Sequence, residues 1–199
     1  MEANKDTKSI ENIELVFLKP EDYREIKAMM IETYSSMPNA YWKEHHIKTL
    51  ISIFHEGQVG IKVDNELAGC ALSIIVDYEK IDSKHTYKAI TGNYSFNTHT
   101  AKGDVSYGID VFIRPKFRGL RLGRRLYDYR KELCEKLNLK GIARKYALDH
   151  PQHAAAVNTR MIRKTCVFRS DECIDKDRRK LVKFNTRPVL RKIEISVLI

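Results

Sequence analysis

Residues 109–126 read IDVFIRPKFRGLRLGRRL, and this stretch decides the fold of the chain. Its first five residues are rich in β-branched and aromatic side chains and predict the end of a strand over 105–113. Pro115 ends that strand, because proline has no N–H to give to a sheet. A basic loop follows, and then a helix is predicted from an apolar stripe at steps of four and three residues. The stripe consists of Leu122, Leu126, Tyr129, Leu133 and Leu137.

A strand, a tight loop and a helix in this order form a geometry that binds phosphate. The first N–H groups of a helix have no partner within it, and the helix dipole adds partial positive charge there. Gly119 allows the backbone to approach an anion closely. Full positive charges come from Arg118, Arg121, Arg124 and Arg125. The alternative is a plain strand–helix corner with surface arginines, which a glycine in the loop would not by itself exclude.

The full pattern Ile113-x-Pro115-x-x-Arg118-Gly119-x-x-x-Gly123 resembles the acyl-CoA-binding signature of the GNAT N-acetyltransferase superfamily, V-x-P-x-x-R-G-x-G-x-G/A. The resemblance implies that the loop holds the CoA pyrophosphate and that the end of the strand holds the pantetheine arm. The implied CoA contacts are Val111, Ile113, Arg118, Gly119, Leu120, Arg121, Leu122, Gly123 and Arg124. Arg121 stands where the family most often has a glycine, so its side chain would either pair with the phosphates or crowd them.

The resemblance covers about residues 12–142 and implies an α/β (α+β layered) fold, with a mixed, mostly antiparallel, twisted sheet flanked by helices. The expected strands are 13–18, 58–63, 67–76 and 105–113, with helices starting at Pro20 and spanning 41–54. Residues 77–104 have no clear period and are expected to form a long loop. Within the superfamily, segments 69–78, 91–94 and 118–127 most resemble acetyltransferase-like domains fused to nitrilase-type carbon–nitrogen hydrolases.

The two ends of the chain differ from this central domain. Residues 1–11 are expected to be a disordered lead-in. Residues 143–199 contain 14 Lys/Arg against 6 Asp/Glu, whereas the remainder contains 22 against 20. The basic segment either completes the fold or is degenerate, and both readings stay open. Completion would use a strand at 139–143, a helix at 151–166 and a hairpin from 181–184 and 189–198.

Composition narrows the partners and the compartment. The basic segment could contact nucleic acid or an acidic surface, but it has few aromatic residues and no recognised nucleic-acid motif, which disfavours nucleic acid. The polar N-terminus lacks the apolar core of a signal peptide, and no apolar run approaches the roughly 20 residues of a membrane span. The four cysteines form no CxxC pair. We therefore expect a cytoplasmic protein with reduced cysteines, no metal and no membrane partner.

The resemblance implies direct transfer of an acetyl or other acyl group from CoA to a small-molecule or peptide amine, in a ternary complex. The acid on the strand before the loop is Asp110, which is either the general base or part of a salt bridge at a strand edge. Tyr107 lies an odd number of residues away, so the two face opposite sides unless a β-bulge intervenes, and Tyr107 is expected in the core.

The general acid has no assignment, and a homodimer is left open. A non-catalytic acyl-CoA-binding module is the alternative function.

The histidines do not form an evident metal site. His45 and His46 are adjacent on a predicted helix and diverge, so we expect one exposed and one half-buried ring. His85 and His99 fall in the long loop, where solvated side chains are preferred over a role in lining a substrate pocket.

Overall fold

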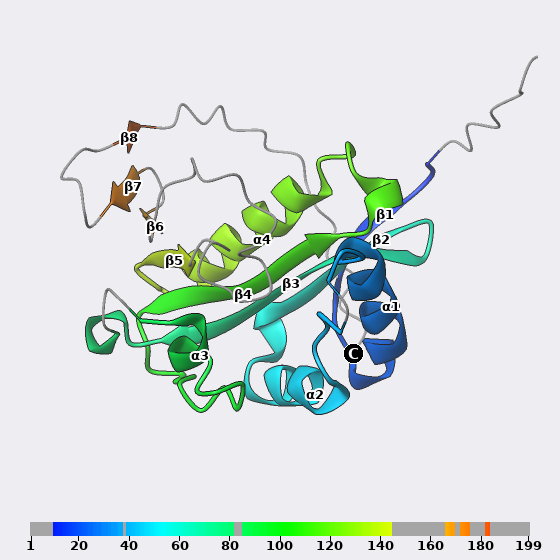
Figure 1. The fold of residues 1–199 in the computed structure, drawn as a ribbon. Helices are drawn as coiled ribbons and strands as arrows, with labels where there is room; N and C mark the ends of the chain where they lie inside the picture. Colours follow the sequence, from blue (N-terminus) through cyan, green and yellow to red (C-terminus); the bar gives the residue numbers. More distant parts are fainter. Residues whose placement is uncertain are drawn as a thin grey trace, which may run out of the picture.

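One β-sheet joins all the strands, in the order in which they occur in the sequence (Figure 1). The computed structural model describes residues 10–37, 39–81 and 85–144, together with the backbone of 166–169, 172–175 and 182–183. The strands are β1 (Ile13–Phe17), β2 (Gln58–Val63), β3 (Glu66–Val76), β4 (Val105–Ile113), β5 (Gly141–Arg144), β6 (Cys166–Arg169), β7 (Glu172–Asp175) and β8 (Val182–Lys183). Neighbouring strands are antiparallel except β4 and β5, which are parallel. The mixed, mostly antiparallel sheet is confirmed.

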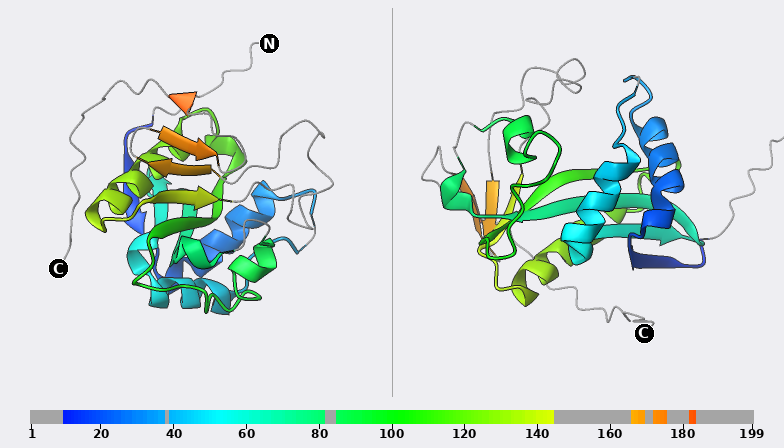
Figure 2. Two further views of the ribbon diagram at one scale, coloured as in Figure 1. Left: turned by 90° about the vertical axis from the view of Figure 1, so that its left-hand side faces the viewer. Right: turned by 90° about the horizontal axis from the view of Figure 1, so that it is seen from below.

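Helices cover both faces of this sheet. The helices are α1 (Tyr23–Thr33), α2 (Glu44–Ile53), α3 (Tyr87–Ile90) and α4 (Leu122–Lys136). One face carries α1, α2 and α3, and the opposite face carries α4 (Figures 1 and 2). Short 3₁₀ turns span Pro20–Asp22, His55–Gly57, Tyr78–Lys80 and Pro115–Phe117. The chain therefore has three layers, with β3 and β4 at the centre of its helix-covered part.

The predicted apolar stripe fixes α4 to the sheet. Leu122 and Leu126 are 2% and 0% exposed and pack with Val59, Ile61 and Ala71. Burying a leucine side chain contributes about 1.5–3 kcal/mol, so both positions stabilise the packing of the first half of the helix on the sheet. On the other face, the core consists mainly of Ile26, Met29, Ile47, Leu50, Leu72, Ile74, Tyr107 and Phe112.

Several predicted boundaries are wrong. The second helix begins at Glu44 rather than at residue 41. The strand expected at 139–143 is β5, and β8 lies within 181–184. The hairpin of β6 and β7 was not predicted, and Cys166, the expected last residue of a helix, begins β6. Residues 151–165 of that helix and the strand at 189–198 lie outside the described residues.

A buried arginine lies between α4 and β4. Arg130 is 2% exposed, and its guanidinium carbon lies 5.4 Å from the centre of the Tyr127 ring. Its Nη2 atom occupies the space above Gly108, where a Cβ atom would approach it to 2.4 Å. Position 108 therefore has no room for a side chain while Arg130 keeps this conformation.

Neither a membrane-spanning helix nor a reactive thiol is evident in the described part of the chain. None of its helices combines the length and apolar composition that a membrane span needs. Cys70 and Cys134 are free and buried, and burial raises the pKa of both thiols. A raised pKa keeps a thiol protonated and unreactive at neutral pH.

Candidate functional site

The described pairing of β4 with β5 ends in the middle of β4. The two strands pair from Val105 with Gly141 to Gly108 with Arg144, and no described residue pairs with 109–113 on that side. The Arg114 N–H donates to the Ala68 carbonyl on β3 at 2.8 Å. In an antiparallel pair such bonds recur at every second residue, so the N–H groups of Val111 and Ile113 point away from β3. The open edge of β4 can therefore pair with an extended ligand.

A β-bulge lies where this described pairing ends. Leu72 pairs with Asp110, but the next residue of β3, Ser73, pairs with Gly108, which leaves Ile109 as the extra residue of β4. The bulge reverses the alternation of side chains, so Tyr107 and Asp110 face the same side of the sheet. Without the bulge, their odd spacing would have placed them on opposite faces.

The loop before α4 presents backbone donors that have no partner among the described residues. Among the described residues, the N–H groups of 119–123 have no hydrogen-bond acceptor, whereas Arg124 and Arg125 donate to the Arg121 carbonyl. No side chain in the described part of the chain caps this end of α4, and the first turn of the helix contains no acidic residue. A helix start without a cap or a carboxylate keeps its partial positive charge available to an anion.

Two left-handed residues shape this loop. Gly119 has a φ of 91° and Arg121 has a φ of 57°. A side chain in the left-handed region costs about 1–2 kcal/mol relative to glycine. The structure thus gives a physical reason for a glycine at position 121 in the family signature. A Cβ atom added at Gly119 or Gly123 would meet nothing within 4 Å, so the space above both residues is open.

The predicted CoA-contact residues lie together but present different groups. Arg118, Gly119, Arg121 and Arg124 are exposed, and Arg124 Nε lies 3.9 Å from Asp128 on α4. Leu122 is buried in the core below α4, so only its backbone faces the loop. The partly buried side chains of Val111, Ile113 and Leu120 pack against the same core. The residues brought together at the open surface are therefore backbone donors and arginines.

Asp110 has two neutral donors on the other face of the sheet. The Tyr34 hydroxyl donates to its Oδ1 at 2.9 Å, and Trp42 Nε1 donates to its Oδ2 at 3.2 Å. Tyr87 donates its hydroxyl to the Ile109 carbonyl at 3.0 Å, in the bulge itself. The α1–α2 connection and α3 thus meet β4 at and beside its bulge.

The phenols around Asp110 remain protonated at neutral pH. Burial, followed by the negative charge of Asp110, raises the pKa of Tyr34 and of Tyr87 well above that of a free tyrosine. Both hydroxyls therefore stay hydrogen-bond donors over the whole physiological range. Sequence reasoning missed both tyrosines, and also Trp42, as neighbours of Asp110.

Two histidines of the long loop are not solvated, so that expectation is wrong. His85 is 8% exposed, and its Nε2 lies 2.9 Å from the hydroxyl of Tyr107, which is fully buried as expected. His99 is half-buried and accepts the Ile75 N–H at its Nδ1, 3.1 Å away, and burial lowers its pKa. Both histidines pair with groups far away in the sequence, so no local pattern indicated their burial.

The other histidine pair matches its expectation. His45 is exposed and His46 is half-buried on α2. Burial, and then the positive charges of His45 and Lys43, lower the pKa of His46. The His46 ring packs edge-on against Trp42, with the two ring centres 5.5 Å apart.

Comparison with known proteins identifies the family. The model of the Acetyltransferase (GNAT) family matches residues 25–162, more than half of the chain. This chain belongs to that family.

Two curated relatives come from Bacillus subtilis (strain 168). The "Probable hydrolase YhcX" is 36% identical over 101 residues, which are 51% of this chain and 20% of that protein. The "Uncharacterized N-acetyltransferase YkwB" is 28% identical over 92 residues, 46% of this chain and 41% of that protein. The match thus spans less than half of either relative.

A solved structure agrees on the fold. The "GphF GNAT-like decarboxylase in complex with isobutyryl-CoA" superposes with a TM-score of 0.55 at 12% identity, over 73% of this chain and 72% of that one. At this identity the likeness concerns the fold alone.

Proposed function

We propose that this chain is an acyl-CoA-dependent N-acyltransferase that transfers an acetyl group from acetyl-CoA to an amine. The observation that carries the proposal is the open edge of β4 beside an uncapped helix start. Val111 and Ile113 offer N–H groups along that edge, and 119–123 offer five more at the loop. The family and the N-acetyltransferase relative support the same chemistry.

The loop and the strand edge would hold the two ends of the cosubstrate. The N–H groups of 119–123, with Arg118 and Arg121, would bind the pyrophosphate. The edge at Val111 and Ile113 would pair with the pantetheine arm as an added strand does. Acetyl-CoA supplies the activated thioester, which would then lie beside the bulge at Ile109.

On the opposite face, the residues around Asp110 would receive the amine. The amine nitrogen would form a bond to the thioester carbonyl carbon, the carbon–sulfur bond would break, and the thiolate would leave and take up a proton. Asp110 would accept the proton that the amine loses, directly or through water. A backbone N–H on the open edge would donate to the oxyanion of the tetrahedral intermediate. The fixed hydroxyls of Tyr34 and Tyr87 would keep the carboxylate and the bulge in place.

A thermal-shift titration with CoA and acetyl-CoA tests the binding step. A ligand that binds only the native state stabilises it, by about 2.7 kcal/mol at one hundred times Kd. We expect a rise in melting temperature with either ligand and none with free adenosine at equal concentration. The absence of any response at millimolar CoA would refute the proposal.

The acetyl transfer itself needs a second assay, with a panel of small amines and peptide N-termini. Release of free thiol that depends on the amine supports the transferase. Binding of acyl-CoA without turnover of any amine would favour the non-catalytic module. Salt-sensitive binding of RNA, without a CoA response, would favour the basic segment as the functional part.

A further inference from the structure

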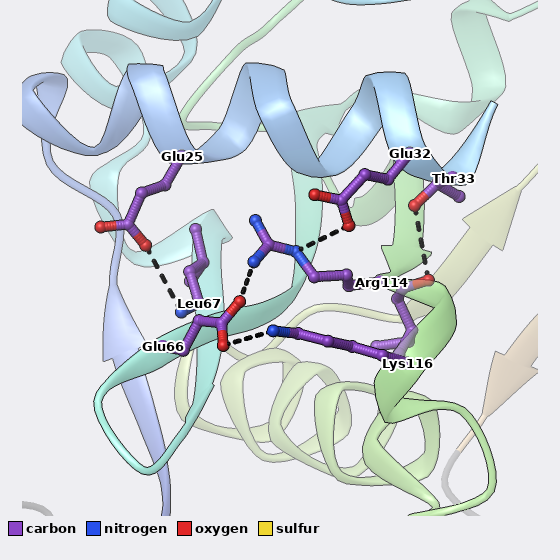
Figure 3. Close-up of polar contacts among 8 residues, drawn as sticks. Glu25, Glu32, Thr33, Glu66, Leu67, Arg114 and Lys116 are labelled. Atoms are coloured by element: carbon purple, nitrogen blue, oxygen red, sulfur yellow. Dashed lines mark hydrogen bonds and ion pairs between the residues drawn. The ribbon is translucent and has the colours of Figure 1, made fainter. Parts of the chain in front are cut away.

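A polar cluster lies where β4 ends and the loop begins (Figure 3). We call it the Arg114 cluster, and it consists of Arg114, Glu32, Glu66 and Lys116. Arg114 Nε lies 3.2 Å from Glu32 Oε2, and its Nη1 forms an ion pair with Glu66 Oε1. Lys116 Nζ lies 2.6 Å from the other oxygen of Glu66. The cluster joins the end of α1 and the start of β3 to the first residues after β4.

Arg114 differs from the other arginines of the signature segment because it is buried. It is 8% exposed, whereas Arg118, Arg121 and Arg124 lie on the surface. A buried guanidinium is costly unless carboxylates compensate its charge, and removal of a partner leaves an uncompensated charge. Two carboxylates from distant parts of the chain provide that compensation. The two ion pairs restrict the orientation of the side chain, although Nε makes no hydrogen bond to a described residue.

The backbone on both sides of Arg114 is fixed as well. Its N–H donates to the Ala68 carbonyl at 2.8 Å, and its own carbonyl accepts the Phe117 N–H at 3.0 Å. One residue earlier, the Ile113 carbonyl accepts the Thr33 hydroxyl at 3.4 Å (Figure 3). The exit of β4 thus contacts β3 on one side and the end of α1 on the other.

The residues on either side of this fixed point belong to the two halves of the proposed site. Downstream, 119–123 have no described hydrogen-bond acceptor, so the path of the loop depends on where it starts. On the α1 side, Thr33 contacts the end of β4, and the next residue, Tyr34, donates to Asp110. Arg114 is the one described side chain with ion pairs both to α1 and to the start of β3.

We propose that Arg114 is a positioning residue, which sets the phosphate-binding loop relative to the edge of β4 through Glu32 and Glu66. This inference rests on the proposed function. It predicts that weakening the cluster impairs recognition of the pyrophosphate and spares that of the pantetheine arm, since Val111 and Ile113 are held by their own pairing with β3.

The experiment compares CoA with pantetheine, which lacks the pyrophosphate and the nucleoside. Affinities of both are measured by calorimetry or ligand-observed NMR for the wild type, Arg114→Lys and Arg114→Gln. Displacements of about 1 Å in a positioned group can cost up to a hundredfold, so we expect roughly a tenfold loss of CoA affinity in Arg114→Gln. Pantetheine affinity is expected to stay within about twofold. The CoA affinity of Arg114→Lys is expected to lie between those of the wild type and Arg114→Gln, because lysine keeps the charge but has a single nitrogen to share between Glu32 and Glu66.

Controls separate this effect from general loss of structure. Lys48→Gln removes one positive charge from an exposed pair with Glu44 on α2, and it should leave both affinities unchanged. If Arg114→Gln does not fold, Glu32→Gln and Glu66→Gln each remove one side of the cluster and should show the same selective loss.

The outcomes also separate this inference from the proposed function. If the wild type binds CoA and the folded variants bind it equally well, the proposed role of Arg114 is wrong, but the proposed function of the protein stands. Equal losses for CoA and pantetheine overturn it as well, because they indicate a general structural effect. A wild type that does not bind CoA contradicts the proposed function itself.

Discussion

The two sides of the candidate site present different chemical groups. On the α4 side, backbone N–H groups and exposed arginines surround open space at Gly119 and Gly123. On the α1 side, the Asp110 carboxylate lies among Tyr34, Trp42 and Tyr87, which donate side-chain hydrogen bonds. One side is an open backbone surface, and the other is a partly buried network of side chains.

This difference indicates which substitutions each side of the site can tolerate. Backbone N–H groups can donate to a phosphate whatever the surrounding side chains are, so this ability should be lost when a side chain fills the space or the loop moves. A side-chain network depends on every member, because a buried donor or acceptor without a partner costs about 1–3 kcal/mol. Substitutions on the two sides should therefore separate binding from turnover.

The largest effect is expected for Gly123→Val. The new side chain fills the open space at the first turn of α4 and should abolish CoA binding while the fold remains, because nothing lies within 4 Å of the added Cβ atom. Calorimetry measures the binding. Glu132→Val, at an exposed position of the same helix, controls for the lower helix propensity of valine. Equal CoA affinity in both variants would argue against the loop as the phosphate site.

Asp110→Asn should separate the two sides most clearly. General base catalysis contributes roughly 10²–10⁴-fold, and we expect a loss of that order in the rate of acyl transfer, with unchanged CoA affinity. The amide has one acceptor oxygen where the carboxylate offered two to Tyr34 and Trp42, which should lower the free energy of unfolding by about 1–3 kcal/mol in a urea titration. Asp77→Asn, in a pair with the exposed Lys80, is the matched control. Retained activity in a folded Asp110→Asn would make Asp110 a structural residue only.

Arg121→Gly is expected to have a smaller, several-fold effect. Glycine removes the side chain from a left-handed residue, so stability should not fall by more than about 0.5 kcal/mol despite the more flexible unfolded chain. If the exposed guanidinium pairs with phosphate, CoA affinity falls by roughly fivefold, since charge-assisted pairs are the stronger hydrogen bonds. Arg121→Lys keeps a positive charge and should retain most of the affinity. Tighter binding of CoA by Arg121→Gly would instead show that Arg121 crowds the site.

The smallest expected effect is the pH dependence of the stabilisation that Glu66 provides at the start of the loop. Burial alone would raise the pKa of Glu66, but Lys116 and Arg114 outweigh it and lower that pKa. The resulting stabilisation is present above the unfolded-state pKa of about 4.3 and is lost as the pH falls through the lower folded-state value. Glu66 is partly exposed, so the contribution should stay below about 1 kcal/mol. The difference in urea midpoint between wild type and Glu66→Gln should be larger at pH 7 than at pH 3.5, and an equal difference would contradict the pair.

The α4 side of the site could be predicted from the sequence better than the α1 side. The reason is that its structure depends on residues close together in the sequence. β2 and β4 have the bounds that the pattern indicated, and the stripe from Leu122 to Leu137 covers the core as expected. These features depend on neighbours within a few residues. The turn at Asp64 and Asn65, both with positive φ, follows equally local preferences.

The α1 side depends on contacts between residues far apart in the sequence. The bulge at Ile109 exists only in the register of β4 against β3. Trp42, expected within a helix, lies before α2 and donates to Asp110. His85 is buried against Tyr107, 22 residues later. The periodicity of apolar residues along the chain does not report contacts between distant residues, so it could not predict the neighbours of Asp110.

The packing of Arg130 against Gly108 has a consequence for sequence variation among relatives. Because the guanidinium occupies the space that a side chain at position 108 would need, the two positions are expected to co-vary. A relative with alanine or a larger residue at 108 should have a shorter residue at 130, and one that keeps the arginine should keep the glycine. This pair of positions therefore distinguishes relatives that keep the arginine packed on β4 from relatives that have lost it.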